Sequence, residues 1–242
     1  MEQIVLITGA ASGIGRETAI KFAKMGYSVI INCKNNVDGL SNLCDQIRSF
    51  SGRVFSYVKD VSKFEEISEI FTDLEKKNMT PDIIINNAGI SYVGLLQDMS
   101  TEQWHDIIDT NLTSMFNSSK LAIPYMLKKG SGRIINISSM WGNVGASCEV
   151  AYSASKGGVN SFTKALAKEL APSGIAVNAI AFGMVDTRMN SFLTDEERAM
   201  LIDEIPAGRI LSAKEAAEII YNVATMNPYV TGQIITADGG MT

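Results

Sequence analysis

The sequence predicts an α/β fold: a single Rossmann-like, doubly wound parallel sheet of about seven strands with helices on both faces. Three observations support this fold. Apolar runs rich in Val and Ile recur along the chain, as is typical of strands that are buried on both faces. The amphipathic segments between them are long enough for the helical crossovers that parallel pairing requires. A glycine-rich turn joins the first apolar run to the first helical segment, as in dinucleotide-binding folds.

The predicted strands and helices alternate along the whole chain. We expect strands near residues 3–8, 28–32, 53–58, 82–85, 133–137, 175–180 and 233–236. The clearest helical patterns cover residues 13–25, 63–77, 102–128, 152–170 and 213–225. Because no repeat, low-complexity tract or linker rich in Pro, Gly or Ser interrupts the alternation, residues 1–242 are expected to form one cofactor-binding and catalytic domain.

Composition argues against several functional classes. The chain of 242 residues is 46% hydrophobic and carries a net charge of −5, whereas nucleic-acid binding usually needs a clustered basic surface. Its cysteines, Cys33, Cys44 and Cys148, form no C-x-x-C pair, so neither a disulfide framework nor a metal site is expected. No apolar run reaches about 18 residues and no signal sequence precedes the first strand, so we expect a cytoplasmic protein without a membrane span.

The first predicted strand leads into a loop with three glycines. Gly9 suits a tight turn, Gly13 lets backbone N–H groups approach a pyrophosphate, and Gly15 allows the next helix to pack close to the strand. The phosphates would then meet the positive end of the helix dipole. We expect this loop, including Ser12 and Ile14, to bind a dinucleotide. An ordinary strand–turn–helix unit can contain such a loop, so the loop alone is weak evidence.

The residues that follow the other strands are further candidates for cofactor contacts. In open parallel sheets, ligands bind beyond the carboxyl ends of the strands. The residues at these positions are Cys33, Lys34, Asp60, Val61, Asn87, Ala88, Gly89, Ser138, Ser139 and Gly183.

Tyr152 and Lys156 are four residues apart at the start of a predicted helix, so their side chains lie on one face within reach of each other. A phenol with a pKa of about 10 is a poor acid or base at neutral pH, but a nearby ammonium favours the phenolate and lowers that pKa. The pair is therefore suited to proton transfer. Because the same spacing is common on helices, its weight depends on the other motifs.

Together these motifs resemble the short-chain dehydrogenase/reductase family, and the similarity covers essentially the full chain. It is carried by Thr8 with the glycine loop, the Asn-Asn-Ala-Gly sequence at residues 86–89, Asn111, Ser139, Tyr152 and Lys156. Each residue could have an ordinary structural role as a cap, a turn or a buried polar group. Their joint occurrence in the family order favours the functional interpretation.

The resemblance implies a role for each catalytic candidate. Tyr152 would be the general acid/base, and Ser139 would hold the substrate oxygen. Ser139 is preferred to Ser138 because its spacing to Tyr152 matches the family pattern. Lys156 would bind the nicotinamide ribose and acidify Tyr152. Asn111 would hold a water molecule of the proton relay.

The resemblance also extends to the segment after the sixth strand. Val185 and Thr187 would contact the cofactor there, and Thr187 occupies the position where the family binds the nicotinamide carboxamide. Phe182 replaces the proline that the family usually has before Gly183. Either the loop over the nicotinamide would be looser without the proline, or the ring of Phe182 would fill that space as an apolar wall.

The residues after the second strand indicate which dinucleotide is bound. NAD-preferring relatives usually have an aspartate there, which accepts hydrogen bonds from the adenosine ribose. Cys33 replaces that carboxylate, and the ammonium of Lys34 can pair with the 2′-phosphate of NADP. Ser12 occupies a position where many NADP-dependent relatives have a basic residue. We predict NADP as the cofactor, with NADPH preferred over NADH.

Within the family, the sequence is most similar to the 3-oxoacyl-acyl-carrier-protein reductases of fatty acid metabolism. The similarity rests on Trp104 and on residues 109–112, 133–136, 230–233 and 239–241. Those reductases often have arginines just before the fifth and sixth strands, where the carrier protein docks, but this chain has Gly130 and Ser173. Docking of an acyl carrier protein is therefore not predicted, although Lys128 and Lys129 carry positive charge nearby.

The predicted function is an oxidoreductase that transfers a hydride between a nicotinamide and a carbonyl or secondary alcohol, with a 3-oxoacyl thioester-like substrate. Alternatives are a sugar or short-chain alcohol dehydrogenase, and a dinucleotide-binding regulator without turnover. A Ser-His-Asp hydrolase is disfavoured because His105 is the only histidine. Residues 184–209 would form a lid over the substrate. The resemblance implies a homotetramer in which the long helices from Glu102 and Tyr152 pair across two-fold axes.

Overall fold

The computed structural model describes residues 3–50, 52–190 and 194–242. At its centre is a seven-stranded sheet with the order β3-β2-β1-β4-β5-β6-β9, in which every neighbouring pair is parallel. Its strands are β1 (Ile4–Ile7), β2 (Ser28–Cys33), β3 (Val54–Val58), β4 (Ile83–Asn86), β5 (Gly132–Ser139), β6 (Ile175–Phe182) and β9 (Ile234–Ala237). The predicted doubly wound parallel sheet is confirmed.

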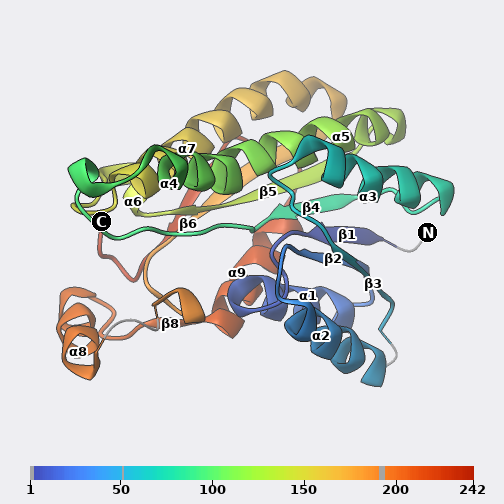
Figure 1. The fold of residues 1–242 in the computed structure, drawn as a ribbon. Coiled ribbons are helices and arrows are strands. Elements are labelled where there is room, and N and C mark those ends of the chain that lie inside the picture. The colour runs from blue at the N-terminus through green and yellow to red at the C-terminus, as the bar shows by residue number, and fades with distance from the viewer. Residues whose placement is uncertain (1–2, 51, 191–193) are drawn as a thin grey trace.

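Helices cover both faces of the sheet (Figure 1). One layer consists of α1 (Gly13–Lys24), α2 (Val37–Ser49) and α9 (Ala213–Ala224). The other layer contains α3 (Phe64–Lys76), α5 (Ser114–Lys129) and α7 (Val150–Leu170). Shorter elements are η1 (Leu96–Asp98), α6 (Trp141–Val144) and η3 (Ala171–Ser173). In the described ranges, no helix is long and apolar enough to cross a bilayer.

Strand residues alternate between the two cores that these layers form. In β1, Val5 and Ile7 belong to the core that contains Phe22 of α1, whereas Leu6 belongs to the core that contains Leu74 of α3. The alternation follows from the two-residue period of a strand. Because both faces are covered, every position of such a strand favours an apolar residue, which explains the continuous Val/Ile runs.

A series of hydrogen bonds between buried polar side chains runs from α5 over β4 and β5 to α7, on one face of the sheet. Ser118 Oγ donates to Asn86 Oδ1 at 2.5 Å, and Asn86 Nδ2 donates to Asn136 Oδ1 at 2.8 Å. Asn136 Nδ2 in turn donates to Thr163 Oγ1 at 2.9 Å. All of these residues are buried. These hydrogen bonds fix the register of β4 and β5 relative to the two helices.

The helix predicted over residues 102–128 is divided. α4 (Thr101–Ile108) begins with a capping box formed by Ser100 and Gln103. A π-helical turn, η2 (Asp109–Thr113), separates α4 from α5. Such turns insert an extra residue into a helix and often occur at functional sites. Asn111 lies in the middle of this turn and is fully buried.

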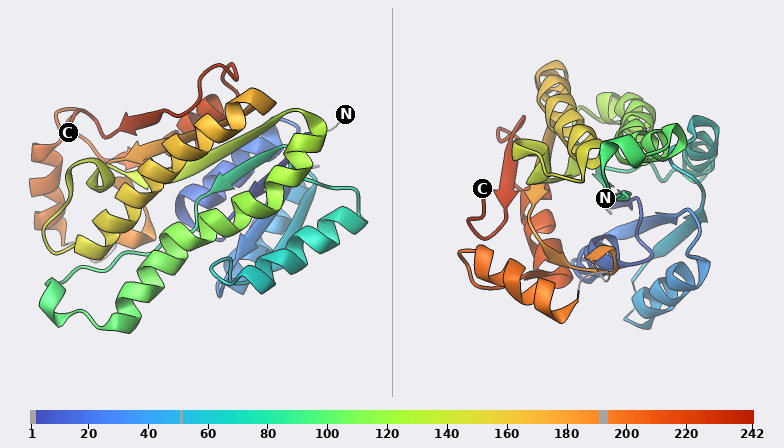
Figure 2. Two further views of the ribbon diagram at one scale, coloured as in Figure 1. Left: turned by 90° about the horizontal axis from the view of Figure 1, so that it is seen from above. Right: turned by 60° about the vertical axis from the view of Figure 1, so that its left-hand side comes forward.

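The segment predicted as a lid contains several short elements. They are β7 (Val185–Asp186), η4 (Arg188–Asn190) and α8 (Asp195–Glu204), and β7 pairs with β8 (Leu211–Ser212). α8 begins with a capping box of Thr194 and Glu197 and has no buried residue. It lies apart from the two helical layers, at the lower left of Figure 1 and at the margin of both views in Figure 2. Residues 191–193 of the predicted lid fall outside the described ranges.

Candidate active site

A cavity of about 740 Å³ lies at the carboxyl ends of the strands. We call its two ends the β2–β3 end, formed by the segments after those strands, and the β6–α8 end, formed by the segment between β6 and α8. Of the predicted site residues, only Gly15 and Asn111 do not contribute to its wall. Those that do are Gly9, Ser12, Gly13, Ile14, Cys33, Lys34, Asp60, Val61, Asn87, Ala88, Gly89, Ser139, Tyr152, Lys156, Gly183, Val185 and Thr187.

Hydrogen bonds to the end of β4 fix the loop between β1 and α1. Thr8 Oγ1 accepts hydrogen bonds from the backbone N–H groups of Asn87 and Ala88, both at 3.0 Å. The side-chain amide of Asn87 donates to the carbonyl oxygens of Thr8 at 2.9 Å and Gly9 at 3.1 Å. A Cβ on Gly15 would lie 2.5 Å from Asn87 Nδ2 and 2.6 Å from the Gly9 oxygen. Gly15 therefore allows close packing of α1 and does not face the cavity.

The loop itself has the shape and the polarity of an anion site. Gly9 and Gly13 have φ values of +66° and +56°, which glycine adopts without the steric cost of a Cβ. Ser12 is the N-cap residue of α1, but its side chain makes no capping hydrogen bond. The N–H groups at the start of a helix lack partners within the helix. Together with the helix dipole, they suit a phosphate group at this position.

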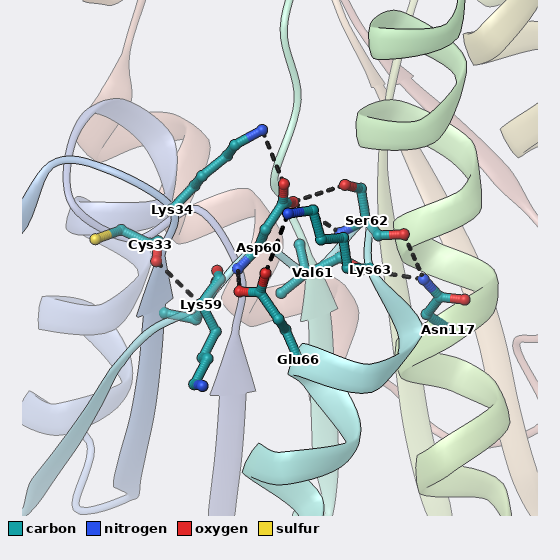
Figure 3. Close-up of polar contacts among 10 residues, drawn as sticks. Cys33, Lys34, Lys59, Asp60, Val61, Ser62, Lys63, Glu66 and Asn117 are labelled. Carbon is teal, nitrogen blue, oxygen red and sulfur yellow. Dashed lines mark hydrogen bonds and ion pairs between the residues drawn. The ribbon is translucent and has the colours of Figure 1, made fainter.

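An ion pair lies at the β2–β3 end of the cavity (Figure 3). Lys34 Nζ is 2.8 Å from Asp60 Oδ2, and Asp60 Oδ1 accepts hydrogen bonds from the backbone N–H and the hydroxyl of Ser62 at 3.1 and 2.7 Å. Burial raises the pKa of the Asp60 carboxyl, but the contacts with Lys34 and Ser62 outweigh burial and hold the pKa below its ordinary value. Asp60 is buried, whereas 57% of the Lys34 side chain is exposed.

Cys33 places a neutral group beside this ion pair. Its Sγ is 3.4 Å from the carbonyl oxygen of Asn36. Burial raises the pKa of the Cys33 thiol, although the contact with Asn36 opposes the rise. The position therefore carries no negative charge at neutral pH. Lys34 is engaged by Asp60 in this structure, a partner that the sequence did not reveal.

Ser139 and Tyr152 meet in the wall of the cavity. A hydrogen bond joins their side chains, and the backbone N–H of Trp141 donates to Ser139 Oγ at 3.2 Å. The neighbouring Ser138 is directed elsewhere, because its Oγ donates to Asn160 Oδ1 of α7 at 2.7 Å. Only Ser139 of the two serines contacts Tyr152 by hydrogen bonding.

Lys156 Nζ donates to the carbonyl oxygen of Ile137 at 2.8 Å and lies 5.6 Å from the centre of the Tyr152 ring. Burial lowers the pKa of Lys156 to about 8. Burial also raises the pKa of Tyr152 to about 12. The charge of Glu149 adds to this rise, and the hydrogen bond with Ser139 opposes it. Desolvation thus disfavours the charged form of both side chains, and the expected lowering of the Tyr152 pKa by Lys156 stays a prediction.

Asn111 lies behind the cavity wall. Its Oδ1 accepts a hydrogen bond from the backbone N–H of Ile90 at 2.8 Å, and its Nδ2 donates to the carbonyl oxygen of Ile90 at 2.9 Å. The same Nδ2 donates to Ser155 Oγ of α7 at 3.0 Å. The side chain thus fixes the segment after Gly89 against α7. Its role in holding a water molecule stays a prediction.

The cavity wall also contains residues that the sequence did not predict. Glu149 Oε2 accepts a hydrogen bond from Ser91 Oγ at 2.9 Å, and Trp141 makes a second hydrogen bond to this carboxylate. The proximity of Glu149 to Tyr152 in the sequence was the available signal. Phe182, which is 3% exposed, is part of the wall, as one of the two alternatives predicts. Further apolar wall residues are Ile90, Val93, Met184, Met189, Leu201, Ile205 and Met241.

The two positions that bear on carrier-protein docking lie at the opposite edge of the sheet. Gly130 ends α5 and precedes β5, and Ser173 precedes β6. A Cβ on Gly174 would lie 2.8 Å from the carbonyl oxygen of Gly130, so the two positions are neighbours. Lys129 Nζ is 2.7 Å from Asp82 Oδ1. This lysine is therefore engaged by a carboxylate of its own chain.

Comparisons with known proteins agree with this geometry. A family model described as short chain dehydrogenase matches residues 3–198. The 3-oxoacyl-acyl-carrier-protein reductase FabG of Thermotoga maritima is 39% identical over 242 residues, which cover 99% of this chain and 97% of the relative. The reductase of the same name from Salmonella typhimurium is 37% identical over 240 residues, which cover 99% of this chain and 97% of that relative.

A solved structure is similar over the same length. It is that of an Agrobacterium tumefaciens protein described as a candidate gluconate dehydrogenase, with a TM-score of 0.94 and 33% identity, and the match covers 99% of this chain and 95% of that chain. Among the residues that the structure describes, no group of three or more His, Cys, Asp or Glu side chains could hold a metal ion. Fold, cavity and full-length similarity agree, and the chain belongs to the short-chain dehydrogenase family of oxidoreductases.

Proposed function

We propose that this protein is an NADPH-dependent reductase that converts a carbonyl group into a secondary alcohol, with a 3-oxoacyl thioester-like substrate. The observation that supports it most directly is that Ser139, Tyr152 and Lys156 line one cavity together with the glycine loop. Relatives named as 3-oxoacyl-acyl-carrier-protein reductases favour this substrate class.

The residues around the cavity fit a nicotinamide dinucleotide. The turn at Gly9 and the start of α1 suit its pyrophosphate. Asp60 and Val61 would hold the adenosine end, and Thr187 would hold the carboxamide. When bound, the nicotinamide supplies the hydride. Lys156 would hydrogen-bond the nicotinamide ribose from a position that the Ile137 carbonyl oxygen fixes.

Tyr152 would donate the proton that completes the reduction. Its pKa of about 12 keeps the hydroxyl protonated at neutral pH, which is the form needed to protonate a carbonyl oxygen as its carbon is reduced. Ser139, already hydrogen-bonded to Tyr152, would hold the same oxygen.

The preference for NADPH follows from Cys33 and Lys34. Cys33 brings no carboxylate that would repel a 2′-phosphate, and the exposed Lys34 ammonium can contact a phosphate beside Asp60. We expect Lys34→Ala to lower kcat/KM for NADPH by about tenfold and to change that for NADH little. Cys33→Asp combined with Lys34→Ala should favour NADH, and salt should weaken the parental preference. A parent protein that already favours NADH would overturn the cofactor assignment.

The substrate class is tested by a panel of acetoacetyl thioesters, sugars and simple ketones with each dinucleotide. We expect the highest kcat/KM with an acetoacetyl thioester and NADPH. Turnover of sugars alone would favour a sugar dehydrogenase, an alternative that the similarity to the Agrobacterium structure supports. Dinucleotide binding without turnover of any compound would favour a regulator.

We further propose that the chain is a single catalytic domain that forms a cytoplasmic homotetramer. Family resemblance supports the tetramer. Docking of an acyl carrier protein is not part of the proposal, because Gly130 and Ser173 offer no positive charge and Lys129 is paired with Asp82.

A further inference from the structure

A carboxylate stands in the cavity close to the proposed proton donor. Glu149 is the N-cap residue of α7, and it lines the same cavity as Tyr152. The hydroxyl of Ser91 and the side chain of Trp141 donate hydrogen bonds to it. The negative charge of Glu149 raises the pKa of Tyr152, so the two side chains are near enough to interact.

Among the residues that the structure describes, no cation pairs with Glu149. Its partners Ser91 and Trp141 are neutral, and Glu149 takes part in none of the ion pairs. Lys34 is at the β2–β3 end of the cavity and pairs with Asp60. Burial raises the pKa of the Glu149 carboxyl and outweighs its two hydrogen bonds, as expected where no positive charge compensates the desolvation.

Positioning of the neighbouring segments does not require this charge. A glutamine at residue 149 could accept the hydrogen bonds of Ser91 and Trp141 without the desolvation cost of a carboxylate. The charge also makes Tyr152 a weaker proton donor. A positive group of the substrate beside Glu149 would offset the desolvation cost of the carboxylate. It would also cancel the effect of the carboxylate on the pKa of Tyr152.

We infer that the substrate carries a positively charged amino group that pairs with Glu149 while Ser139 and Tyr152 hold its carbonyl oxygen. This inference rests on the proposed reductase function and narrows its substrate to a carbonyl compound with an ammonium group. The wall of the same cavity includes Met184 and Met189, whose unbranched side chains can adapt to an alkyl portion of such a substrate.

Three methyl ketones that differ mainly in charge test this inference. They are 4-(dimethylamino)butan-2-one, which is a cation at neutral pH, its neutral isostere 5-methylhexan-2-one, and the anion 4-oxopentanoate. We expect kcat/KM of the parent protein with NADPH to be about tenfold higher for the cation than for its isostere. The anion should be the poorest substrate, because Glu149 repels it.

Variants of Glu149 test whether the selectivity for the cationic over the neutral ketone depends on the charge of this side chain. Glu149→Gln should lower the ratio of kcat/KM between the cationic and the neutral ketone about tenfold. Glu149→Asp, which keeps the charge, should retain more of that ratio. Asp106→Asn is the matched control, because Asp106 is an exposed carboxylate that lines the same cavity near Lys34. It should leave the ratio close to the parental value.

The outcomes separate this inference from the function on which it rests. A parent protein that reduces the neutral ketone as well as the cationic one, or a Glu149→Gln variant that keeps the parental ratio, overturns the inference and leaves the reductase function intact. Failure of the parent to reduce the three ketones, with reduction of an acetoacetyl thioester preserved, also overturns the inference alone, whereas failure with the ketones and the thioester, with dinucleotide binding preserved, contradicts both. If Glu149→Gln does not fold, the order of the kcat/KM values of the three ketones with the parent protein still tests the inference.

Discussion

Lys156 is a buried amine, with 3% of its surface exposed, and burial lowers its pKa to about 8. In an unfolded chain a lysine titrates near 10.4. Between these two values the unfolded chain binds more protons than the folded one, so the free energy of unfolding rises with pH. Tyr152 acts in the opposite direction only above about pH 10, where the unfolded phenol ionises and the folded phenol, with a pKa of about 12, does not.

Replacement of Lys156 by methionine should remove this pH dependence. We expect the free energy of unfolding of the parent to rise by about 2–3 kcal/mol relative to Lys156→Met between about pH 8 and 10. Urea denaturation followed by circular dichroism measures both proteins at each pH. Because the comparison cancels the titrations that the two proteins share, a difference that stays constant with pH would contradict the lowered pKa.

Tyr152→Phe removes the proposed proton donor and keeps the ring. Turnover should fall by about 10²–10⁴-fold, which is the usual contribution of a general acid, while the affinity for NADPH stays close to the parental value. Fluorescence titration with NADPH and initial rates with a good ketone measure the two effects. Lys156→Ala should reduce both affinity and rate. Near-parental reduction by Tyr152→Phe would rule out the assigned acid.

At the scale of elements, the packing of α1 against the end of β4 depends on Gly15. A Cβ there would lie 2.6 Å from the Gly9 oxygen and 2.5 Å from Asn87 Nδ2. We expect Gly15→Ala to destabilise the protein by about 1–3 kcal/mol, as overpacking usually does, and to weaken dinucleotide binding because the phosphate loop must shift. Thermal unfolding and NADPH titration measure these effects.

Gly157→Ala is the matched control for this substitution. Its Cβ would meet only the carbonyl oxygen of Gly142, at 3.6 Å, and alanine is the better helix former by about 1 kcal/mol. This variant should therefore melt at a slightly higher temperature than the parent. If Gly15→Ala behaved like Gly157→Ala, the close approach at the loop would be unimportant.

Elements with an apolar pattern could be predicted from the sequence, and those without one could not. The five inner strands of the sheet are almost wholly buried, the edge strands β3 and β9 are only partly buried, and all seven begin within one residue of their predicted starts. α2 also buries Leu40, Leu43, Cys44 and Ile47 at helical spacing, so its helix was predictable although it was not among the predicted segments. α8 has no buried residue, and η2 is a single π-helical turn of five residues, so neither leaves a periodic signal.

At the scale of the whole molecule, we expect exposed apolar side chains of α5 to lie in an interface of the proposed tetramer. Phe116 and Leu127 on α5 are 46% and 47% exposed, although large apolar side chains favour burial. We expect light scattering to give the mass of four 26.2 kDa chains, and Phe116→Glu to lower that mass by placing a charge in the interface. Val37→Glu, on α2 in the other helical layer, is the control and should leave the mass unchanged. A parental monomer at micromolar concentration would exclude the tetramer.

The positions of the cofactor and catalytic candidates were predictable because the ends of parallel strands meet at one edge of a sheet. Their electrostatics were not predictable. The pKa values of Tyr152 and Lys156 depend on how deeply the surrounding chain buries them, and the pairing of Lys34 with Asp60 brings together residues from different strands. Glu149 was missed because a carboxylate at the start of a helix is usually a capping or surface residue.

The series of buried side-chain hydrogen bonds between α5 and α7 also has a consequence for folding. Asn86 and Asn136 are 50 residues apart in the sequence, so their hydrogen bond forms only after a long loop has closed, which is slow. If β4 paired with β5 in a shifted register, these amides and the hydroxyls of Ser118 and Thr163 would be buried without partners, at a cost of about 1–3 kcal/mol each. Compact chains in which β4 and β5 pair in a shifted register are therefore less stable than those with the native register. We expect β4, β5, α5 and α7 to form in one cooperative step, late and together.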